Sequence, residues 1–227
     1  MAYKQINISS GHSINCQGAS GYVNEVTEAR KVVDRVYEMC KAMGIEVYKY
    51  HDTASSSSQN LANIVNFHNR FKDGIDVSIH FNAYQTTSNP MGVEVCYYSQ
   101  SSVASSVSSA IAQAGGFKNR GAKERKGLYF LKHTNKPAIL IEVCFCDSKA
   151  DVDLYHKNFD AICAAIVKAL TGAVYNAPKP QHASAPAKPT TKVMYRVVTG
   201  SYASRENAEA QVKKLKDAGF DSFITTK

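Results

Sequence analysis

The sequence lacks any long apolar run. No stretch approaches the roughly 18 to 20 consecutive apolar residues of a membrane helix, and residues 1–13 lack a basic segment followed by an apolar one. We therefore expect a globular protein with no membrane partner, made in the cytoplasm without a cleaved export signal. With 227 residues and 44% hydrophobic content, the chain can bury the core of one good-sized domain and carry an appendage.

Regular cysteine spacing is also lacking. Cys144 and Cys146 are too close together for a C-x-x-C metal knuckle or redox motif. Free cysteine is among the most buried residue types. We therefore expect most of the six cysteines to be small core residues of a protein in a reducing compartment. They are Cys16, Cys40, Cys96, Cys144, Cys146 and Cys163.

The sequence has no long basic run interleaved with aromatic residues, although its formal net charge is +8. Residues 1–175 carry 18 Lys and Arg against 15 Asp and Glu, whereas residues 176–227 carry 9 against 4. The C-terminal part is therefore the basic part. Since neither part interleaves aromatic residues with a long basic run, we expect no nucleic-acid partner. A polyanionic surface fits this charge distribution as well as a nucleic acid does.

Apolar periodicity predicts an α/β fold. Alternating or continuously apolar segments predict strands at residues 4–9, 45–50, 75–81, 92–98, 128–131 and 138–145. Three- and four-residue spacing predicts helices at residues 25–43, after a cap within 55–58, at 103–114 and at 149–170, and residues 119–127 are interpreted as a basic loop. This alternation indicates a twisted, mostly parallel sheet of about six strands with helices on both faces.

A composition change marks the end of the first predicted domain, residues 1–175. Residues 176–192 are rich in Pro and Ala and predict a semi-extended linker. Residues 193–227 then predict a small β-α-β segment, with strands at 193–199 and 220–225. The helix between them, at 204–218, has Ser204 as its cap.

His80 lies at the carboxyl end of the apolar strand 75–81, where ligands bind in open α/β sheets. Zinc hydrolases hold their metal with three His or carboxylate ligands. His12, in the loop after the first strand, and Glu25, in the first turn of the first helix, are the other candidates. Each has an ordinary structural explanation when taken alone, and Glu28, one turn after Glu25, is a competing ligand.

Glu142 is an unusual residue, because it interrupts a strand that is otherwise nearly all apolar. Burying a charged carboxylate costs several kcal/mol unless it is paired, protonated or near a cation. A neighbouring zinc ion would compensate this charge, and Glu142 could then serve as the general base of hydrolysis. The alternative is a buried salt bridge to Arg120 or Lys123.

Five motifs in register carry a resemblance to a known family. They are GHS at residues 11–13, VNE at 23–25, SIHFNA at 78–83, NRGAK at 119–123 and ILIEVCFCD at 139–147. In order and spacing they resemble the zinc-dependent N-acetylmuramoyl-L-alanine amidases of the amidase-3 type, above all the catalytic domains of phage endolysins of Gram-positive hosts. The resemblance covers about residues 1–175.

The resemblance implies that His12, Glu25 and His80 bind Zn²⁺ and that Glu142 is the catalytic acid/base. The substrate would be bacterial peptidoglycan, cut at the amide between N-acetylmuramic acid and L-alanine of the stem peptide, with lysis of the wall as the result. Asn82 and residues 119–123 are candidates for supporting or substrate contacts. Asp147 stands where many relatives have asparagine, which puts only a local turn in doubt.

Residues 195–220 resemble the opening strand and helix of a SPOR module, a small peptidoglycan-binding domain. A full module is about twice as long, so this partial SPOR-like segment predicts either a shortened module or self-association in which a second copy completes the sheet. The alternative is a poorly ordered basic tail attracted to anionic wall polymers.

Two other functions are compatible with the sequence: a zinc carboxypeptidase that acts on stem peptides, and a non-catalytic peptidoglycan-binding protein. We expect the protein to act on the cell wall after release through a membrane pore or after lysis of a mother cell. A phage endolysin and a host or sporulation autolysin both fit this expectation.

Overall fold

The computed structural model describes residues 2–176, 200–220 and 222–224. The chain divides into two compact units, Met1–Ala177 and Pro178–Lys227. Within the described residues, no helix combines the length and apolar character that a membrane span requires. The strand expected at residues 193–199 and nearly all of the expected linker lie outside the described residues.

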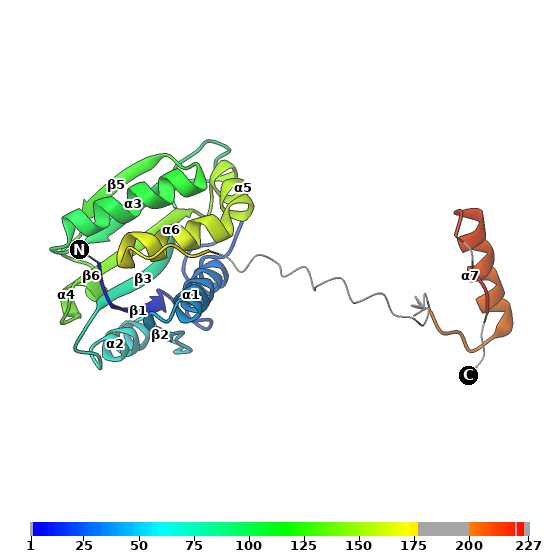
Figure 1. The fold of residues 1–227 in the computed structure, drawn as a ribbon, viewed down its shortest axis with the longest axis horizontal. Coiled ribbons are helices and arrows are strands. Elements are labelled where there is room, and N and C mark those ends of the chain that lie inside the picture. Colours follow the sequence, from blue (N-terminus) through cyan, green and yellow to red (C-terminus); the bar gives the residue numbers. More distant parts are fainter. Residues whose placement is uncertain (1, 177–199, 221, 225–227) are drawn as a thin grey trace, which may run out of the picture. The chain divides into compact units, whose positions relative to one another are not determined.

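A six-stranded sheet organises the first unit (Figure 1). Its strands are β1 (Gln5–Ser10), β2 (Glu46–Tyr50), β3 (Ile75–Asn82), β4 (Val93–Tyr97), β5 (Asn119–Glu124) and β6 (Ala138–Phe145). They follow the order β2-β1-β3-β6-β4-β5. Neighbours are parallel except for β4 and β6, which pair antiparallel. The predicted mostly parallel sheet of about six strands is therefore confirmed.

Helices cover both faces of this sheet. They are α1 (Glu25–Ala42), α2 (Ser57–His68), α3 (Ser101–Gly115), α4 (Tyr129–His133), α5 (Lys149–Lys157) and α6 (Phe159–Thr171). Figure 1 shows α1, α6 and α3 side by side, and α6 contacts both of the others. Their apolar residues join one large core, whereas α2 and α4 enclose a smaller core against the other face.

The two central strands, β3 and β6, divide their side chains between these cores. Successive side chains of a strand point to opposite faces. Ile79 and Ile141 belong to the large core, so their neighbours His80 and Glu142 face the α2/α4 side. His80 and Glu142 are direct partners in the parallel register. The pairing therefore brings an imidazole and a carboxylate to neighbouring positions on one face.

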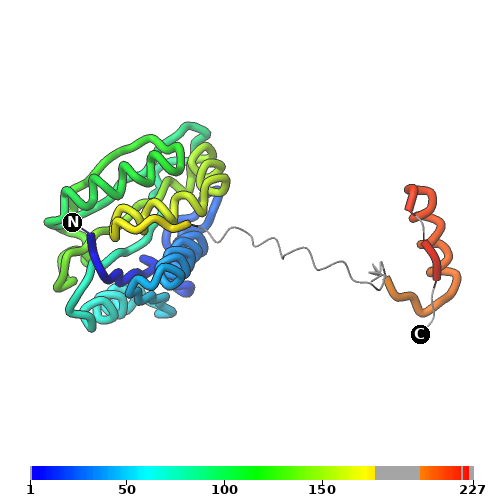
Figure 2. Tube along the Cα trace, viewed as in Figure 1, coloured from blue at the N-terminus to red at the C-terminus, as the bar shows by residue number. Residues whose placement is uncertain are grey.

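The start of the chain is held against the end of the first unit. Figure 2 shows the N-terminal segment beside the final turn of α6, where the Tyr3 N–H donates a hydrogen bond to the Leu170 carbonyl over 2.9 Å.

All six cysteines are free. Five of them are buried, and Cys16 is partly exposed. The prediction of mostly core cysteines is confirmed.

Three local predictions are wrong. Residues 119–124 of the expected basic loop form edge strand β5, because a strand at the edge of a sheet needs no apolar sequence when its ladder bonds to β4 hold it. The expected strand 128–131 is instead the start of helix α4. The expected long helix 149–170 is two helices, α5 and α6, separated at Asn158.

The second unit contains α7 (Arg205–Asp217), which confirms the predicted helix. The Ser204 hydroxyl oxygen accepts a hydrogen bond from the Asn207 N–H over 3.2 Å and caps the helix. None of the helix residues is buried. The strand expected at residues 220–225 is wrong for its described part, since residues 220 and 222–224 adopt no strand.

Candidate metal centre

Three elements bring the predicted ligands to the carboxyl edge of the sheet. The Gly11 N–H donates to the Ile79 carbonyl over 2.9 Å, which ties the loop after β1 to β3 and fixes His12 near His80. The Asn24 side chain accepts from the Thr27 N–H and caps α1, so Glu25 occupies the first helical turn.

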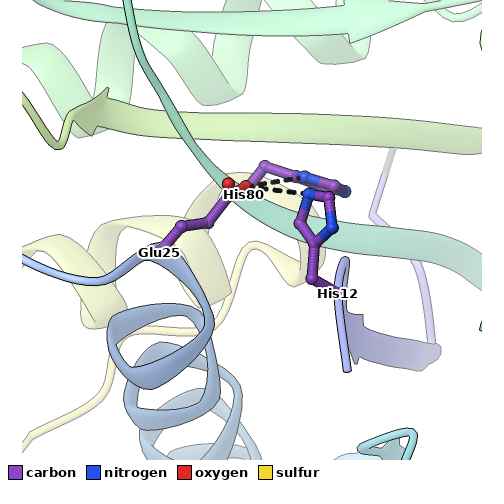
Figure 3. Close-up of side chains that lie close together, drawn as sticks. All are labelled: His12, Glu25 and His80. Carbon is purple, nitrogen blue, oxygen red and sulfur yellow. Dashed lines mark hydrogen bonds and ion pairs between the residues drawn. The ribbon is translucent and has the colours of Figure 1, made fainter. Parts of the chain in front are cut away.

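The side chains of His12, Glu25 and His80 converge (Figure 3). Glu25 Oε1 lies 2.9 Å from His80 Nδ1 and 3.4 Å from His12 Nε2. One ligand atom from each residue lies within 4.8 Å of the other two. Two imidazoles and one carboxylate, drawn from a loop, a strand and the first turn of a helix, therefore form a compact donor set.

Two glycines leave the space that this donor set occupies. A Cβ atom at Gly11 would lie 1.8 Å from His80 Nε2, and a Cβ at Gly18 would lie 2.1 Å from Glu25 Oε2 and 2.6 Å from His12 Cδ2. Any larger residue at either position would displace a member of the set. Two nitrogens and a carboxylate oxygen are the ligand types of a zinc site that keeps an open position, so the donor set fits this metal.

Hydrogen bonds hold the Glu25 carboxylate in place. Its Oε2 accepts from the Ala19 N–H over 2.7 Å, and its Oε1 accepts from the Phe81 N–H over 3.2 Å. Burial alone would raise the pKa of Glu25, but the hydrogen bond from His80, the charges of His80 and His12 and the bond from the Ala19 N–H together outweigh it and lower this pKa. Burial alone would lower the pKa of His80, but the hydrogen bond to Glu25 and the charges of Glu142 and Glu25 together outweigh it and raise this pKa. Glu25 is therefore held as an anion.

The competing ligand Glu28 lies elsewhere. Its Oε2 accepts a hydrogen bond from the Tyr155 hydroxyl over 3.0 Å, and its Oε1 pairs with Lys31 over 2.8 Å. Both carboxylate oxygens are thus occupied on the α1/α6 side of the sheet. Of the two glutamates, the structure brings only Glu25 to the histidines.

Glu142 stands beside this cluster with an unpaired oxygen. Its Oε2 atom is buried and, within the described residues, has no hydrogen-bond partner. Burial raises the pKa of Glu142 to about 7, although the nearby His80 opposes the shift. The salt bridge considered as an alternative does not form: Arg120 pairs instead with Glu94 over 2.7 Å, and within the described residues Glu142 Oε2 has no partner, Lys123 included. The carboxylate therefore remains available to a group that enters the site.

A further acid, Glu94, was missed by the sequence reasoning. It is the direct partner of Glu142 across the antiparallel pair β4 and β6. Its Oε1 accepts from Asn82 Nδ2 over 3.3 Å, and its Oε2 accepts from Arg120 Nε. The signal that identified Glu142, an acid within an apolar strand, is present at Glu94 too. Asn82 and Arg120, both predicted to lie near the site, are thereby placed beside Glu142.

The local turn at Asp147 is well defined. Its Oδ2 accepts a hydrogen bond from the Tyr84 N–H over 2.8 Å. A pocket of about 90 Å³ extends from His80 between the sheet and helices α2 and α4. It is lined mainly by apolar side chains, together with His80: Gly11, Leu61, Ile64, Ser78, Leu128, Tyr129, Phe130 and Leu140.

The fold and the site define an α/β protein with a two-histidine, one-glutamate centre at the carboxyl edge of its sheet. The family model described as N-acetylmuramoyl-L-alanine amidase matches residues 6–172. The chain belongs to this family. A SPOR domain model matches residues 166–226, which confirms the second resemblance.

Relatives and solved structures agree with this assignment. An uncharacterized 38.4 kDa protein of Clostridium perfringens is 33% identical over 176 residues, which are 75% of this chain and 52% of that protein. The chain thus spans about half the length of the curated relatives it matches. The catalytic domain of the CD27L endolysin, which targets Clostridia difficile, is 27% identical with a TM-score of 0.67, covering 77% of this chain and 100% of that one. An N-acetylmuramoyl-L-alanine amidase from Clostridium difficile 630 is 25% identical with a TM-score of 0.61, covering 74% and 94%.

Proposed function

We propose that this protein is a zinc-dependent N-acetylmuramoyl-L-alanine amidase that cleaves bacterial peptidoglycan and thereby lyses the cell wall. His12, Glu25 and His80 would hold the zinc ion, and Glu142 would be the catalytic acid/base. Family membership supports the bond that is cut. The observation that carries the mechanism is the buried, unpaired Glu142 Oε2 beside the convergent cluster.

The chemistry divides between the metal and the protein. When bound, zinc would polarise the scissile carbonyl and lower the pKa of a water molecule. The Glu142 carboxylate accepts the proton of the attacking water and then returns it to the nitrogen of the departing L-alanine. The pKa of about 7 that burial gives Glu142 belongs to the metal-free protein, and a nearby cation would favour the ionised carboxylate that accepts the proton.

The C-terminal segment supports a proposal about targeting. The SPOR match supports binding of peptidoglycan by residues 193–227, with anionic wall polymers as a second surface and with self-association of two copies. The wall is then the place of action, reached from the cytoplasm after pore-mediated release or mother-cell lysis.

Product analysis tests the proposed reaction. Purified Gram-positive walls are digested with the zinc-loaded protein, and the products are identified by mass spectrometry and amino-group labelling. The proposal predicts new L-alanine amino groups together with intact, unsubstituted lactyl carboxyl groups. Release of a C-terminal amino acid would indicate a carboxypeptidase, and binding without any product would indicate a non-catalytic protein. Either of these results would overturn the proposal.

A further inference from the structure

Arg120 is the extra residue of a β-bulge next to the site. Val93 pairs with Asn119, but the next residue, Glu94, pairs with Gly121, so Arg120 has no partner of its own on β4. Gly121 follows with a φ of +80°, a conformation that favours glycine. Bulges beside active sites commonly redirect a side chain. Here the bulge directs the Arg120 side chain from edge strand β5 toward Glu94.

Two contacts fix the guanidinium of Arg120. Its Nε donates to Glu94 Oε2 over 2.7 Å, and its Cζ lies 4.9 Å from the centre of the Phe145 ring. Within the described residues its side-chain hydrogen bond comes from Nε alone, so Nη1 and Nη2 remain for a ligand. The side chain is 31% exposed, whereas that of Glu94 is 7% exposed. A pre-positioned guanidinium with two unused nitrogens is suited to bind a carboxylate.

Glu94, which binds the guanidinium, is one strand away from Glu142. Glu94 and Glu142 are direct partners on neighbouring strands, whose Cα atoms are about 5 Å apart in such pairs. In a stem peptide, the second residue is a glutamate whose α-carboxylate is separated from the scissile nitrogen by a few bonds, about 5 to 6 Å when extended. Muramic acid itself has no carboxylate once its lactyl group forms the amide. An anion at Arg120 must therefore come from the peptide side.

We propose that Arg120 binds the α-carboxylate of the stem-peptide glutamate and makes the enzyme prefer stems in which this group is ionised over those in which it is amidated. This inference rests on the proposed amidase function and assigns the β4/β5 side of the site to the peptide. Glu94 is the positioning residue: it accepts a hydrogen bond from Asn82 and holds the guanidinium of Arg120 in place.

Two matched substrates test this assignment: N-acetylmuramoyl-L-alanyl-D-isoglutamate, with a free α-carboxylate, and the corresponding D-isoglutamine compound, with a carboxamide. The full chain should cleave the carboxylate with a kcat/KM about tenfold higher, mainly through KM, because a charge-assisted hydrogen bond is about twice as strong as a neutral one. Arg120→Ala should remove the preference by raising KM for the carboxylate substrate. Arg120→Lys should retain part of it, because lysine keeps the charge but not the two-nitrogen geometry.

Two further variants keep the test decisive. Arg120→Ala leaves the buried Glu94 without its cationic partner, so the double variant with Glu94→Gln replaces it if the single variant does not fold. Arg125→Ala is the matched control, because Arg125 is an exposed arginine just beyond β5, and it should keep the tenfold preference. Equal cleavage of both substrates by the wild type, or an unchanged preference after removal of Arg120, would overturn the inference alone. Cleavage of neither substrate would instead contradict the proposed function.

Discussion

The two halves of the site differ in how their polar atoms are satisfied. On one side, Glu25 accepts hydrogen bonds from two backbone N–H groups and from His80, so the cluster is fixed before anything binds. On the other side, Glu142 is half-buried, and its buried Oε2 has no hydrogen-bond partner within the described residues. An unsatisfied buried carboxylate is costly. In the proposed mechanism, the first half holds the cation and the second half exchanges a proton.

The largest expected effects are on activity, and substitutions in the two halves should differ in whether zinc is kept. Glu142→Gln should lower kcat by about 10³-fold or more, because general acid–base catalysis is lost, and the protein should still bind one zinc ion. His80→Ala should lose both the activity and the metal. Zinc content by atomic absorption, measured with kcat on the same samples, checks both results. Full activity of Glu142→Gln with zinc bound would refute the division of roles.

A smaller effect, on zinc affinity, is expected from crowding the cluster of His12, Glu25 and His80. Gly18→Ala places a Cβ against both Glu25 and His12, so we expect zinc affinity to fall about 10- to 100-fold, as when other groups that orient metal ligands are changed. The control is Gly127→Ala, because a Cβ at Gly127 meets nothing within 4 Å. Competition with a chromogenic chelator measures both affinities. Equal affinity of the two variants would show that the cluster tolerates displacement.

The smallest effect concerns the stability of the metal-free protein. Folded Glu142, with a pKa of about 7 against an ordinary 4.5, keeps a proton that the unfolded chain releases between these values. Its burial therefore lowers the free energy of unfolding as pH rises through this window. Glu142→Gln should be more stable than the wild type by up to about 3 kcal/mol at pH 8, and equal to it near pH 4. Denaturant unfolding at both pH values checks this, and a pH-independent difference would contradict it.

The sequence predicted the parts of the fold whose residues alternate or recur regularly. Strand β3 and helix α1 have clear apolar periods, and the cap at Ser56 for α2 falls within its expected range. The prediction of a loop at residues 119–124 was wrong because β5 consists of polar and small residues, which pairing with β4 holds at the sheet edge. Pairing between distant segments leaves no periodic signal in a strand of this kind.

The candidate site was predictable to a similar extent. Motifs in register pointed to His12, Glu25, His80 and Glu142, and the structure brings the first three together with Glu142 beside them. The link through Glu94 was not predicted, since it depends on the antiparallel insertion of β4 next to β6. Strand order of this kind is a tertiary property that local sequence does not encode.

Anomalous diffraction at the zinc edge, from crystals of the zinc-loaded protein, tests the central claim most directly. The account predicts one peak about 2.0 to 2.2 Å from a nitrogen of His12, a nitrogen of His80 and an oxygen of Glu25, the distances usual for zinc. Glu142 would lie beside the ion without ligating it. A peak bound by other residues, or one that lacks any of these three ligands, would contradict the account.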